Sequence, residues 1–224
     1  MALVSVIPAR GGSKGIPKKN LAKLGQLTLV ERTLKFSSSI NLISQTILSS
    51  DSIEILQIAK NYDNVILHHR PAYLSDDNST TDDLLLHLIE VYNLKMSDVI
   101  LILEPTSPFR SLSSFYNAYS QFQSSDCDTL ITVAEDRGAF WVYNDQGKLI
   151  RAFNNTSSRR QERKPIFREL GVFYLIKVGA FISRSMISGS QNLYAYEING
   201  IEQIDINTPV DLQIAQQLHN LNEI

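Results

Sequence analysis

Cysteine and long hydrophobic runs are almost absent from this chain of 224 residues. Cys127 is the single cysteine, which excludes an intrachain disulfide and a zinc site built from several cysteines. The longest aliphatic run, Val99–Leu103, is far shorter than the ~20 residues that a membrane-spanning helix needs. Met1 leads almost directly into the apolar segment 3–7, without the charged and apolar stretches of a secretion signal. We therefore expect a soluble, cytoplasmic protein that has no membrane partner.

Net charge is also nearly absent, because 21 lysines and arginines oppose 23 aspartates and glutamates. This balance argues against a nucleic-acid-binding protein, which is usually clearly basic. The cations are nevertheless clustered, since nine of the 21 fall within residues 10–19 and 159–168. These nine are Arg10, Lys14, Lys18 and Lys19 in the first window and Arg159, Arg160, Arg163, Lys164 and Arg168 in the second. The two windows predict local sites for anions.

Short apolar runs alternate with segments of helical periodicity, which is typical of βαβ units around a parallel sheet. We expect strands at 3–7, 45–49, 65–67, 99–103, 129–133, 172–178 and 194–198. Helices are expected at 28–38, 51–62, 81–94, 111–124 and from 208 onward. An apolar fraction of 43% is ample for a packed core. The pattern predicts an α/β fold with a mostly parallel sheet and helices on both faces.

The alternation breaks after residue 133. Residues 137–168 contain Trp141, Tyr143, a turn sequence at 144–147 and a polar run at 154–163. Such a segment is typical of a hairpin and not of another βαβ unit. We therefore predict an arm inserted into the α/β domain.

The first predicted strand leads into IPARGGSKGIPKKN, residues 7–20. Glycines let the backbone approach a phosphate closely, and successive N–H groups can form an anion-binding nest. Arg10 can grip phosphate oxygens through two parallel hydrogen bonds, whereas lysines act as mobile point charges. The spacing matches neither the GxxxxGK[ST] loop of nucleoside triphosphatases nor the GxGxxG loop of dinucleotide-binding proteins. We interpret the segment as a phosphate-binding loop; a flexible, solvated basic loop is the alternative.

This fourteen-residue stretch closely resembles the signature of the N-acylneuraminate cytidylyltransferases, which join CTP to a nine-carbon acidic sugar and release diphosphate. The resemblance extends over essentially the whole chain, with further matches at 70–74, 105–110, 160–171 and 204–207. It implies a Rossmann-like sheet and a single nucleotidyltransferase domain, residues 1–224. The arm, residues 137–170, would contact a partner subunit in a homodimer. CTP and an acidic nine-carbon sugar are the implied substrates, and Mg²⁺ is the implied cofactor.

The resemblance also suggests which residues bind the nucleotide. Cations aimed at the departing diphosphate stabilise the transition state, so Arg10 and Lys19 are the expected catalytic residues of the loop. By resemblance the triphosphate is bound by Arg10, Ser13, Lys14, Lys19 and Asn20, and the cytidine by Arg70, Ser79 and Thr81. Thr80 has two interpretations, a nucleotide contact or a helix-capping box with Asp83.

Three further residues are expected at the sugar. Glu104 follows the central strand, where family members commonly have glutamine, and a carboxylate there could contact the sugar or Mg²⁺. Arg160 and Arg168 would reach the sugar carboxylate in the neighbouring subunit's active site, because a planar guanidinium fits a carboxylate. Residues 170–172 read Leu-Gly-Val where the family typically has Asn-Gly-Ala. These departures keep open an alternative sugar, an eight-carbon 3-deoxy-octulosonic acid.

Asp205 is the expected metal ligand and a catalytic residue. Asn207 replaces a second aspartate that is common in the family, and on an extended strand both side chains lie on one face. Asp211 is interpreted first as a capping residue of the last helix and second as a metal ligand. A non-catalytic protein that senses nucleotides through the same loop is the alternative from another functional class. His87, on an apolar helix, is interpreted as a core histidine whose hydrogen bonds are satisfied.

Overall fold

The computed structural model describes residues 1–12, 15–153 and 158–222. One sheet has the strand order β11-β7-β10-β6-β1-β4-β5. These strands are β1 (Leu3–Pro8), β4 (Ile43–Ser50), β5 (Val65–His69), β6 (Val99–Ile102), β7 (Thr129–Asp136), β10 (Ile166–Lys177) and β11 (Leu193–Glu197). Neighbouring strands run parallel except where β10 pairs with β6 and β7. The predicted mostly parallel α/β sheet is confirmed.

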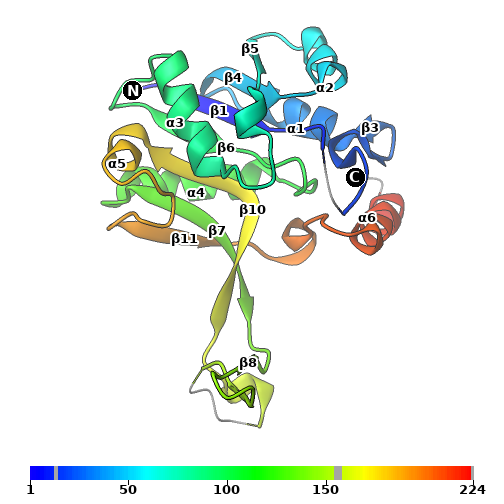
Figure 1. The fold of residues 1–224 in the computed structure, drawn as a ribbon, viewed down its shortest axis with the longest axis vertical. Helices are drawn as coiled ribbons and strands as arrows, with labels where there is room; N and C mark the ends of the chain where they lie inside the picture. The colour runs from blue at the N-terminus through cyan, green and yellow to red at the C-terminus, as the bar shows by residue number, and fades with distance from the viewer. Residues whose placement is uncertain (13–14, 154–157, 223–224) are drawn as a thin grey trace.

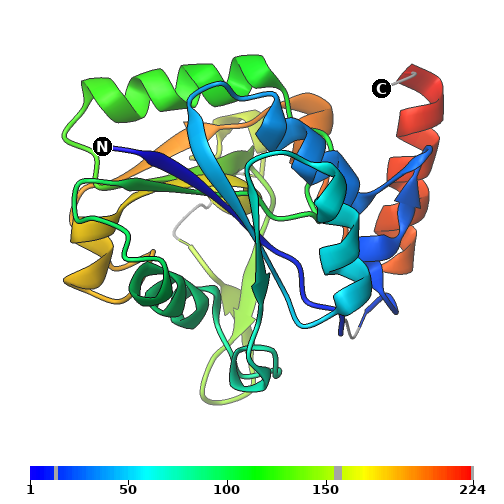
Figure 2. The same ribbon diagram turned by 90° about the horizontal axis from the view of Figure 1, so that it is seen from above.

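Helices cover both faces of the sheet, as predicted. Leu101 of β6 packs with the core on the side of α1 (Leu29–Ser38), α2 (Ile53–Ile58) and α4 (Leu112–Ser124). Its neighbours Ile100 and Ile102 pack on the side of α3 (Thr81–Val91) and α5 (Val178–Ile182). This alternation follows from the two-residue period of a strand. Figure 2 shows α4 on one side of the sheet and α3 and α5 on the other.

Smaller elements complete the body of the molecule. A hairpin of β2 (Lys23–Leu24) and β3 (Leu27–Thr28) packs beside α6 (Pro209–Asn222) at one end of the sheet. Single 3₁₀ turns occur at η1 (Lys19–Leu21), η2 (Ala59–Asn61), η3 (Ala72–Leu74), η4 (Arg160–Glu162) and η5 (Gly200–Gln203). In the described parts of the chain, the helices are all too short or too polar to cross a membrane.

Local sequence explains where α1 begins. Thr28 accepts a hydrogen bond from Glu31 N at 3.2 Å, and the Glu31 carboxylate accepts one from Thr28 N at 2.7 Å. This reciprocal capping box satisfies two backbone donors that the first helical turn leaves free. Local sequence also explains where α3 ends. The helix predicted at 81–94 stops at Val91, and Asn93 adopts a left-handed φ of 49° just beyond it. Asparagine tolerates that conformation better than most residues.

An arm projects from the body of the molecule (Figure 1). Its stem consists of the outer parts of β7 and β10, which pair antiparallel from Ile166–Asp136 to Leu170–Thr132. A hairpin of β8 (Trp141–Tyr143) and β9 (Leu149–Arg151) lies at its far end. The strand predicted from residue 172 therefore begins at Ile166, because one strand serves both sheet and stem. Its pairing with β7 shifts register just after Leu170.

Candidate active site

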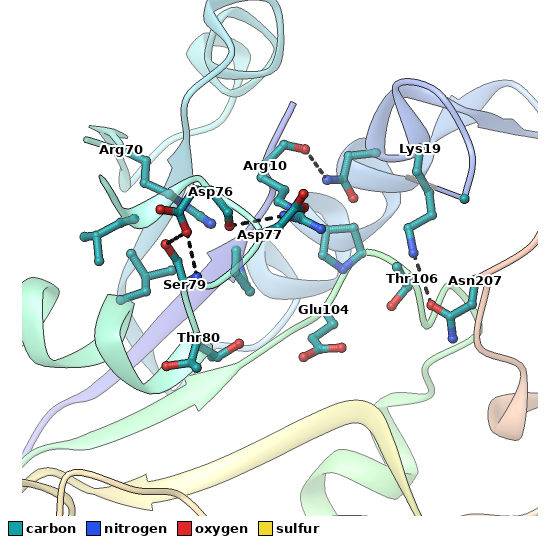
Figure 3. A pocket seen from close by; sticks show the side chains of 17 residues that line it. Arg10, Lys19, Arg70, Asp76, Asp77, Ser79, Thr80, Glu104, Thr106 and Asn207 are labelled. Carbon is teal, nitrogen blue, oxygen red and sulfur yellow. Dashed lines mark hydrogen bonds and ion pairs between the residues drawn. The ribbon is translucent and has the colours of Figure 1, made fainter. Parts of the chain in front are cut away.

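A cavity of about 380 Å³ lies at the C-terminal ends of β1, β5 and β6 (Figure 3). Parallel strands bring their following loops to the same edge, which is where open α/β sheets bind ligands. The structure gathers eight of the predicted residues around this cavity: Arg10, Lys19, Asn20, Arg70, Ser79, Thr81, Glu104 and Asn207. Asp76, Asp77 and Thr106, which the sequence analysis did not select, also line it. Ser13 and Lys14 lie outside the described residues.

The loop after β1 is held by hydrogen bonds to its backbone and by close backbone packing. Asn20 is only 5% exposed, and its Nδ2 donates to the Arg10 carbonyl at 2.8 Å. Gly11 N donates to the Asp51 carboxylate at 2.7 Å. Gly15 lies so close to the Asn207 carbonyl that a Cβ there would stand 2.5 Å from its oxygen. Asn20 thus shapes the loop from beneath, and the glycine is needed for close backbone approach.

The side chain of Lys19 brings a positive charge to the cavity. Its Nζ donates to the Ile206 carbonyl at 2.9 Å and to Asn207 Oδ1 at 3.2 Å. Burial lowers the pKa of Lys19, while the nearby Asp205 and Glu104 carboxylates act in the opposite direction. An ammonium group has three hydrogens, so one remains for a ligand oxygen.

Arg10 is paired with an acidic turn across the cavity. Its Nη1 lies 3.2 Å from Asp77 Oδ1 and donates to the Asp76 carbonyl at 3.4 Å. Both charged side chains are partly exposed, and exposed ion pairs contribute little stability. A polyphosphate can therefore displace Asp77 from Arg10 at small cost. The adjacent Asp76 and Asp77, between Arg70 and Ser79, were the sequence signal for this contact.

Arg70 is fixed by the end of β4. The side chain is 7% exposed, and its Nε donates to Ser49 Oγ at 3.1 Å while Nη2 donates to the Ser49 carbonyl at 3.0 Å. Burial lowers the pKa of Arg70 to about 10, which leaves it charged at neutral pH. Ser49 was not predicted as a site residue. Its role depends on the strand pairing that places it beside the loop after β5.

A chain of hydrogen bonds continues from Ser49 to the surface. Ser49 Oγ, which accepts from Arg70, lies 2.9 Å from His68 Nδ1. His68 Nε2 lies 3.2 Å from His87 Nε2, and His87 Nδ1 lies 3.1 Å from the Tyr73 hydroxyl. Burial, aided by His87 and Arg70, lowers the pKa of His68 to about 4, so His68 is neutral at neutral pH. His87 is hydrogen-bonded at both ring nitrogens, as expected.

The segment before α3 is a turn followed by a helix cap. Thr80 and Asp83 form a reciprocal capping box, so the capping interpretation of Thr80 is confirmed. The Ser79 hydroxyl lies 2.7 Å from the Tyr73 carbonyl and 2.8 Å from Asp76 Oδ1. Both contacts engage the hydroxyl within the turn. Thr81 also lines the cavity, and its hydroxyl forms no hydrogen bond to any other described residue.

Glu104 extends from the loop after β6 into the cavity (Figure 3). Burial, reinforced by the Asp205 charge, raises the pKa of Glu104 to about 7, against the opposing effects of Arg110 and Lys19. Arg110 holds this loop to the bulge of β10, because its Nη2 donates to the Glu104 and Gly171 carbonyls and its Nε to the Val172 carbonyl. The sequence analysis used Arg110 only as part of the 105–110 match and assigned it no role.

A second group of predicted residues surrounds an adjacent cavity of about 310 Å³. Arg168, Asp205 and Asp211 line it, and Asn207 borders both cavities. Asn207 Nδ2 donates to Asp205 Oδ2 at 2.6 Å, although residues 204–207 lie outside the strands. Asp211 Oδ2 accepts from Thr208 N at 2.7 Å and from Asn207 N at 3.0 Å, which is a cap at the start of α6. A metal-binding role for Asp211 stays a prediction.

Asp205 fits a divalent cation better than its neighbours do. Its Oδ1 is buried and has no hydrogen-bond partner within the described chain. Buried oxygens of this kind call for a donor or an ion. No cluster of three or more His, Cys, Asp or Glu among the described residues could hold a metal alone. Mg²⁺ commonly takes one or two carboxylates and completes its ligands with phosphate oxygens and water. The residues therefore fit a metal shared with a bound phosphate ligand.

The two arginines of the arm region lie in different places. Arg168 lies on β10 and lines the same cavity as its own chain's Asp205. Its role at a neighbouring subunit's sugar site stays a prediction. Arg160 is exposed in η4 and lines neither cavity. Its role at a partner's sugar site stays a prediction.

Known proteins are similar to this chain in sequence and in fold. A Helicobacter pylori pseudaminic acid cytidylyltransferase and UDP-2,4-diacetamido-2,4,6-trideoxy-beta-L-altropyranose hydrolase is 28% identical, over 92% of this chain but 40% of the relative. The CMP-N,N'-diacetyllegionaminic acid synthase of Legionella pneumophila is 26% identical, over 100% of this chain and 98% of that protein. The chain thus spans less than half of the Helicobacter relative.

A solved structure of a CMP:2-keto-3-deoxy-manno-octonic acid synthetase complexed with CTP superposes with a TM-score of 0.73. The superposition covers 99% of this chain and 100% of the other at 14% identity, which establishes the fold. The profile of the family described as cytidylyltransferase matches residues 4–223. The match leaves out only four of the 224 residues and includes every element of the cavity described above. The chain therefore belongs to the cytidylyltransferase family.

Proposed function

We propose that the protein transfers CMP from CTP to the anomeric hydroxyl of a nonulosonic acid of the sialic, legionaminic or pseudaminic type. The observation that carries this proposal is the pair of cavities that meet at Asn207. One brings together Arg10, Lys19 and Arg70, and the other contains Asp205 and an arginine. The first suits a nucleoside triphosphate and the second an acidic sugar. The names of the Helicobacter and Legionella relatives support the same substrate classes.

In this reaction the anomeric oxygen attacks the α-phosphorus in line with the departing diphosphate. A bond from the sugar oxygen to phosphorus forms, the bond from phosphorus to the bridging oxygen breaks, and diphosphate leaves with that electron pair. The proton of the hydroxyl passes to solvent water. Lys19 and Arg10 stabilise the charge that grows on diphosphate, and they act strongly because the cavity partly excludes water. Arg70, held rigid by Ser49, and the free hydroxyl of Thr81 orient the cytidine.

Mg²⁺ is proposed as the cofactor, with Asp205 as its protein ligand and Asn207 as a neutral oxygen donor beside it. When bound, the metal would neutralise negative charge on phosphate oxygens. The buried, unpartnered Asp205 Oδ1 supports this assignment. Lys19 now donates to Asn207 Oδ1, so it can release that oxygen when it turns to a phosphate.

We further propose that the arm binds a second copy of the chain. Trp141, Val142 and Tyr143 of β8 and Leu149 and Ile150 of β9 are all exposed on it. Apolar side chains gathered on one projecting element favour burial in a subunit interface. Sedimentation of the intact chain and of a variant with charged residues at Val142 and Ile150 tests this dimer. A cytoplasmic location, where thiols stay reduced, agrees with the single buried Cys127.

A diphosphate-release screen tests the function directly. CTP and, separately, UTP are combined with Mg²⁺ and a panel of nine-carbon and eight-carbon acidic sugars. We expect turnover with CTP and a nine-carbon acid, and loss of turnover when Mg²⁺ is chelated. Release with 3-deoxy-octulosonic acid alone would assign the eight-carbon alternative. CTP binding without turnover on any sugar would assign the nucleotide-sensing alternative.

Two neighbouring lysines provide a matched pair for this screen. Lys19→Met removes a cation from the cavity and should lower turnover by ~10²-fold or more. Lys18→Met removes the same charge, but Lys18 pairs with Glu54 at the surface, 2.7 Å away. This control should retain nearly full turnover. Equal losses in the two variants would contradict the proposed role of Lys19.

A further inference from the structure

A third cavity, of about 280 Å³, lies between α1 and the loop that follows β6. It shares no lining residue with the two cavities assigned above to nucleotide and sugar. Residues 32, 35, 36 and 39 form one wall, because this spacing places their side chains on one face of α1. The full lining is Leu27, Arg32, Lys35, Phe36, Ser39, Pro108 and Arg110.

Positive charge dominates this cavity. Three of its seven lining residues are cations and none is acidic. Within residues 1–12, 15–153 and 158–222, none of these three cations forms an ion pair with a carboxylate. Glu31, next to Arg32 in the sequence, is bound by Thr28 in the capping box. Arg32 and Lys35 therefore have no ion-pair partner among the described residues, whereas Arg110 interacts electrostatically with Glu104, Asp205 and Glu202.

Arg32 is the least satisfied of the three. Its Nε is buried and has no hydrogen-bond partner in the described structure. Its Cζ lies 5.8 Å from the centroid of the Phe109 ring, a contact that supplies no acceptor for the Nε hydrogen. Burial lowers the pKa of Arg32, and no carboxylate opposes this effect. A buried donor without a partner is costly unless water or an ion satisfies it.

Arg110 approaches from the opposite wall. Its three described hydrogen bonds go to backbone carbonyls, which are neutral. Its Cζ lies 6.0 Å from the ring centroid of Phe36, a residue that also lines the cavity. Burial lowers the pKa of Arg110 to about 9, against the opposing effects of Glu104, Asp205 and Glu202, so the group is charged at neutral pH. Two arginines and one lysine thus line a single cavity.

We propose that this cavity is a second anion-binding site, which takes a compact phosphate or diphosphate. Guanidinium groups match the oxygens of phosphate with parallel, charge-assisted hydrogen bonds. Leu27, Phe36 and Pro108 shield part of the cavity from water, which strengthens such bonds. Lys35 lies exposed at its edge, where an ammonium group attracts an anion and contributes less once it is bound. This proposal does not depend on the identity of the sugar or the nucleotide.

Isothermal titration of the intact protein with inorganic phosphate, at low and constant ionic strength, tests the site. Arg32→Gln should weaken phosphate binding at least about tenfold, since a hydrogen bond between charged groups is lost. Lys35→Gln should weaken it by about threefold, as suits an exposed cation. Lys60→Gln removes the same charge from an exposed position on η2 and should leave binding unchanged. Circular dichroism of each variant verifies that it folds.

Lys19→Gln separates this site from the proposed nucleotide site. Phosphate binding that persists in Lys19→Gln and falls in Arg32→Gln supports the proposal. Binding that is abolished by Lys19→Gln and unaffected by Arg32→Gln would overturn it, because all phosphate would then occupy the first cavity. Equal loss in both variants, or no binding by the wild type at millimolar phosphate, would overturn it as well. Titration of the same four variants with diphosphate shows which of the two anions the cavity binds more tightly.

Discussion

Replacement of Glu104 by glutamine should stabilise the folded protein at alkaline pH. Glu104 has a folded-state pKa of about 7, well above its ordinary value of 4.5, because burial and Asp205 disfavour the ionised form. Between these two pH values the folded chain holds a proton that the unfolded chain has released. Stability therefore falls as pH rises from 4.5 to 7 and stays reduced above this window. Glutamine has nearly the same shape and carries no charge at any of these pH values.

The pKa values set the size of the effect. Each pKa unit corresponds to about 1.4 kcal/mol, so the ionised carboxylate of Glu104 costs about 3 kcal/mol at pH 8. At pH 5 most of that cost is absent, because this pH lies only slightly above the pKa of 4.5 in the unfolded chain, while Glu104 is protonated in the folded chain. A cost of about 1 kcal/mol remains. The stability advantage of Glu104→Gln over the wild type should therefore grow by roughly 2 kcal/mol between pH 5 and pH 8.

Urea unfolding of wild type and Glu104→Gln at pH 5, 6, 7 and 8 measures this difference. Glu90→Gln is the matched control, because Glu90 is exposed on α3 and its replacement makes the same change in charge. The control should keep a constant difference from the wild type across this range. An advantage of Glu104→Gln that does not grow with pH, or a variant less stable than wild type at pH 8, would refute the assignment of a buried, charge-destabilised carboxylate.

Four further substitutions test individual contacts. Ser49→Ala leaves the buried Nε of Arg70 without a hydrogen-bond partner, so the free energy of unfolding in urea should fall by about 1–3 kcal/mol. The KM for CTP should rise, and an unchanged KM would contradict the positioning of Arg70 by Ser49. Thr80→Ala removes one half of a capping box and should cost about 1 kcal/mol in the same unfolding assay, and no loss would show that α3 does not need its cap. Asp205→Asn should lower turnover, and titration calorimetry should find most of the CTP affinity retained. Equal losses of turnover and of CTP affinity would instead make Asp205 a nucleotide-binding residue. Arg168→Met should raise the KM for the sugar much more than that for CTP, and equal increases would remove Arg168 from the sugar site.

Much of the fold is predictable because it depends on short-range pattern. The apolar runs of β1 and β6 and the Thr28–Glu31 capping box all act within a few residues, and each is found in the expected element. The beginning of β10 was wrong for a physical reason. Residues 166–170 form a strand only by pairing with β7, about 30 residues earlier, so their own composition does not indicate it.

The candidate site shows the same division. Glycine and cation spacing identified the loop of Arg10 and Lys19, the family resemblance indicated Arg70, and the end of the central strand indicated Glu104. The hydrogen-bond chain through Ser49 and His68 was not foreseen, because it requires the parallel register that places these two residues side by side in β4 and β5. His87 completes the chain only because α3 packs across that part of the sheet.

The sequence by itself determined the α/β architecture, the glycine- and cation-rich loop after β1 and the family, since these are carried by local periodicity and by residue types at fixed spacing. The tertiary structure alone decided which charges meet. It divided the predicted residues between two cavities joined at Asn207, left Arg160 on the arm and put Arg168 beside its own chain's Asp205. It also left Arg32 without an ion-pair partner among the residues that the structure describes. Burial and charge neighbours depend on contacts between distant segments, and these contacts set the pKa of Glu104.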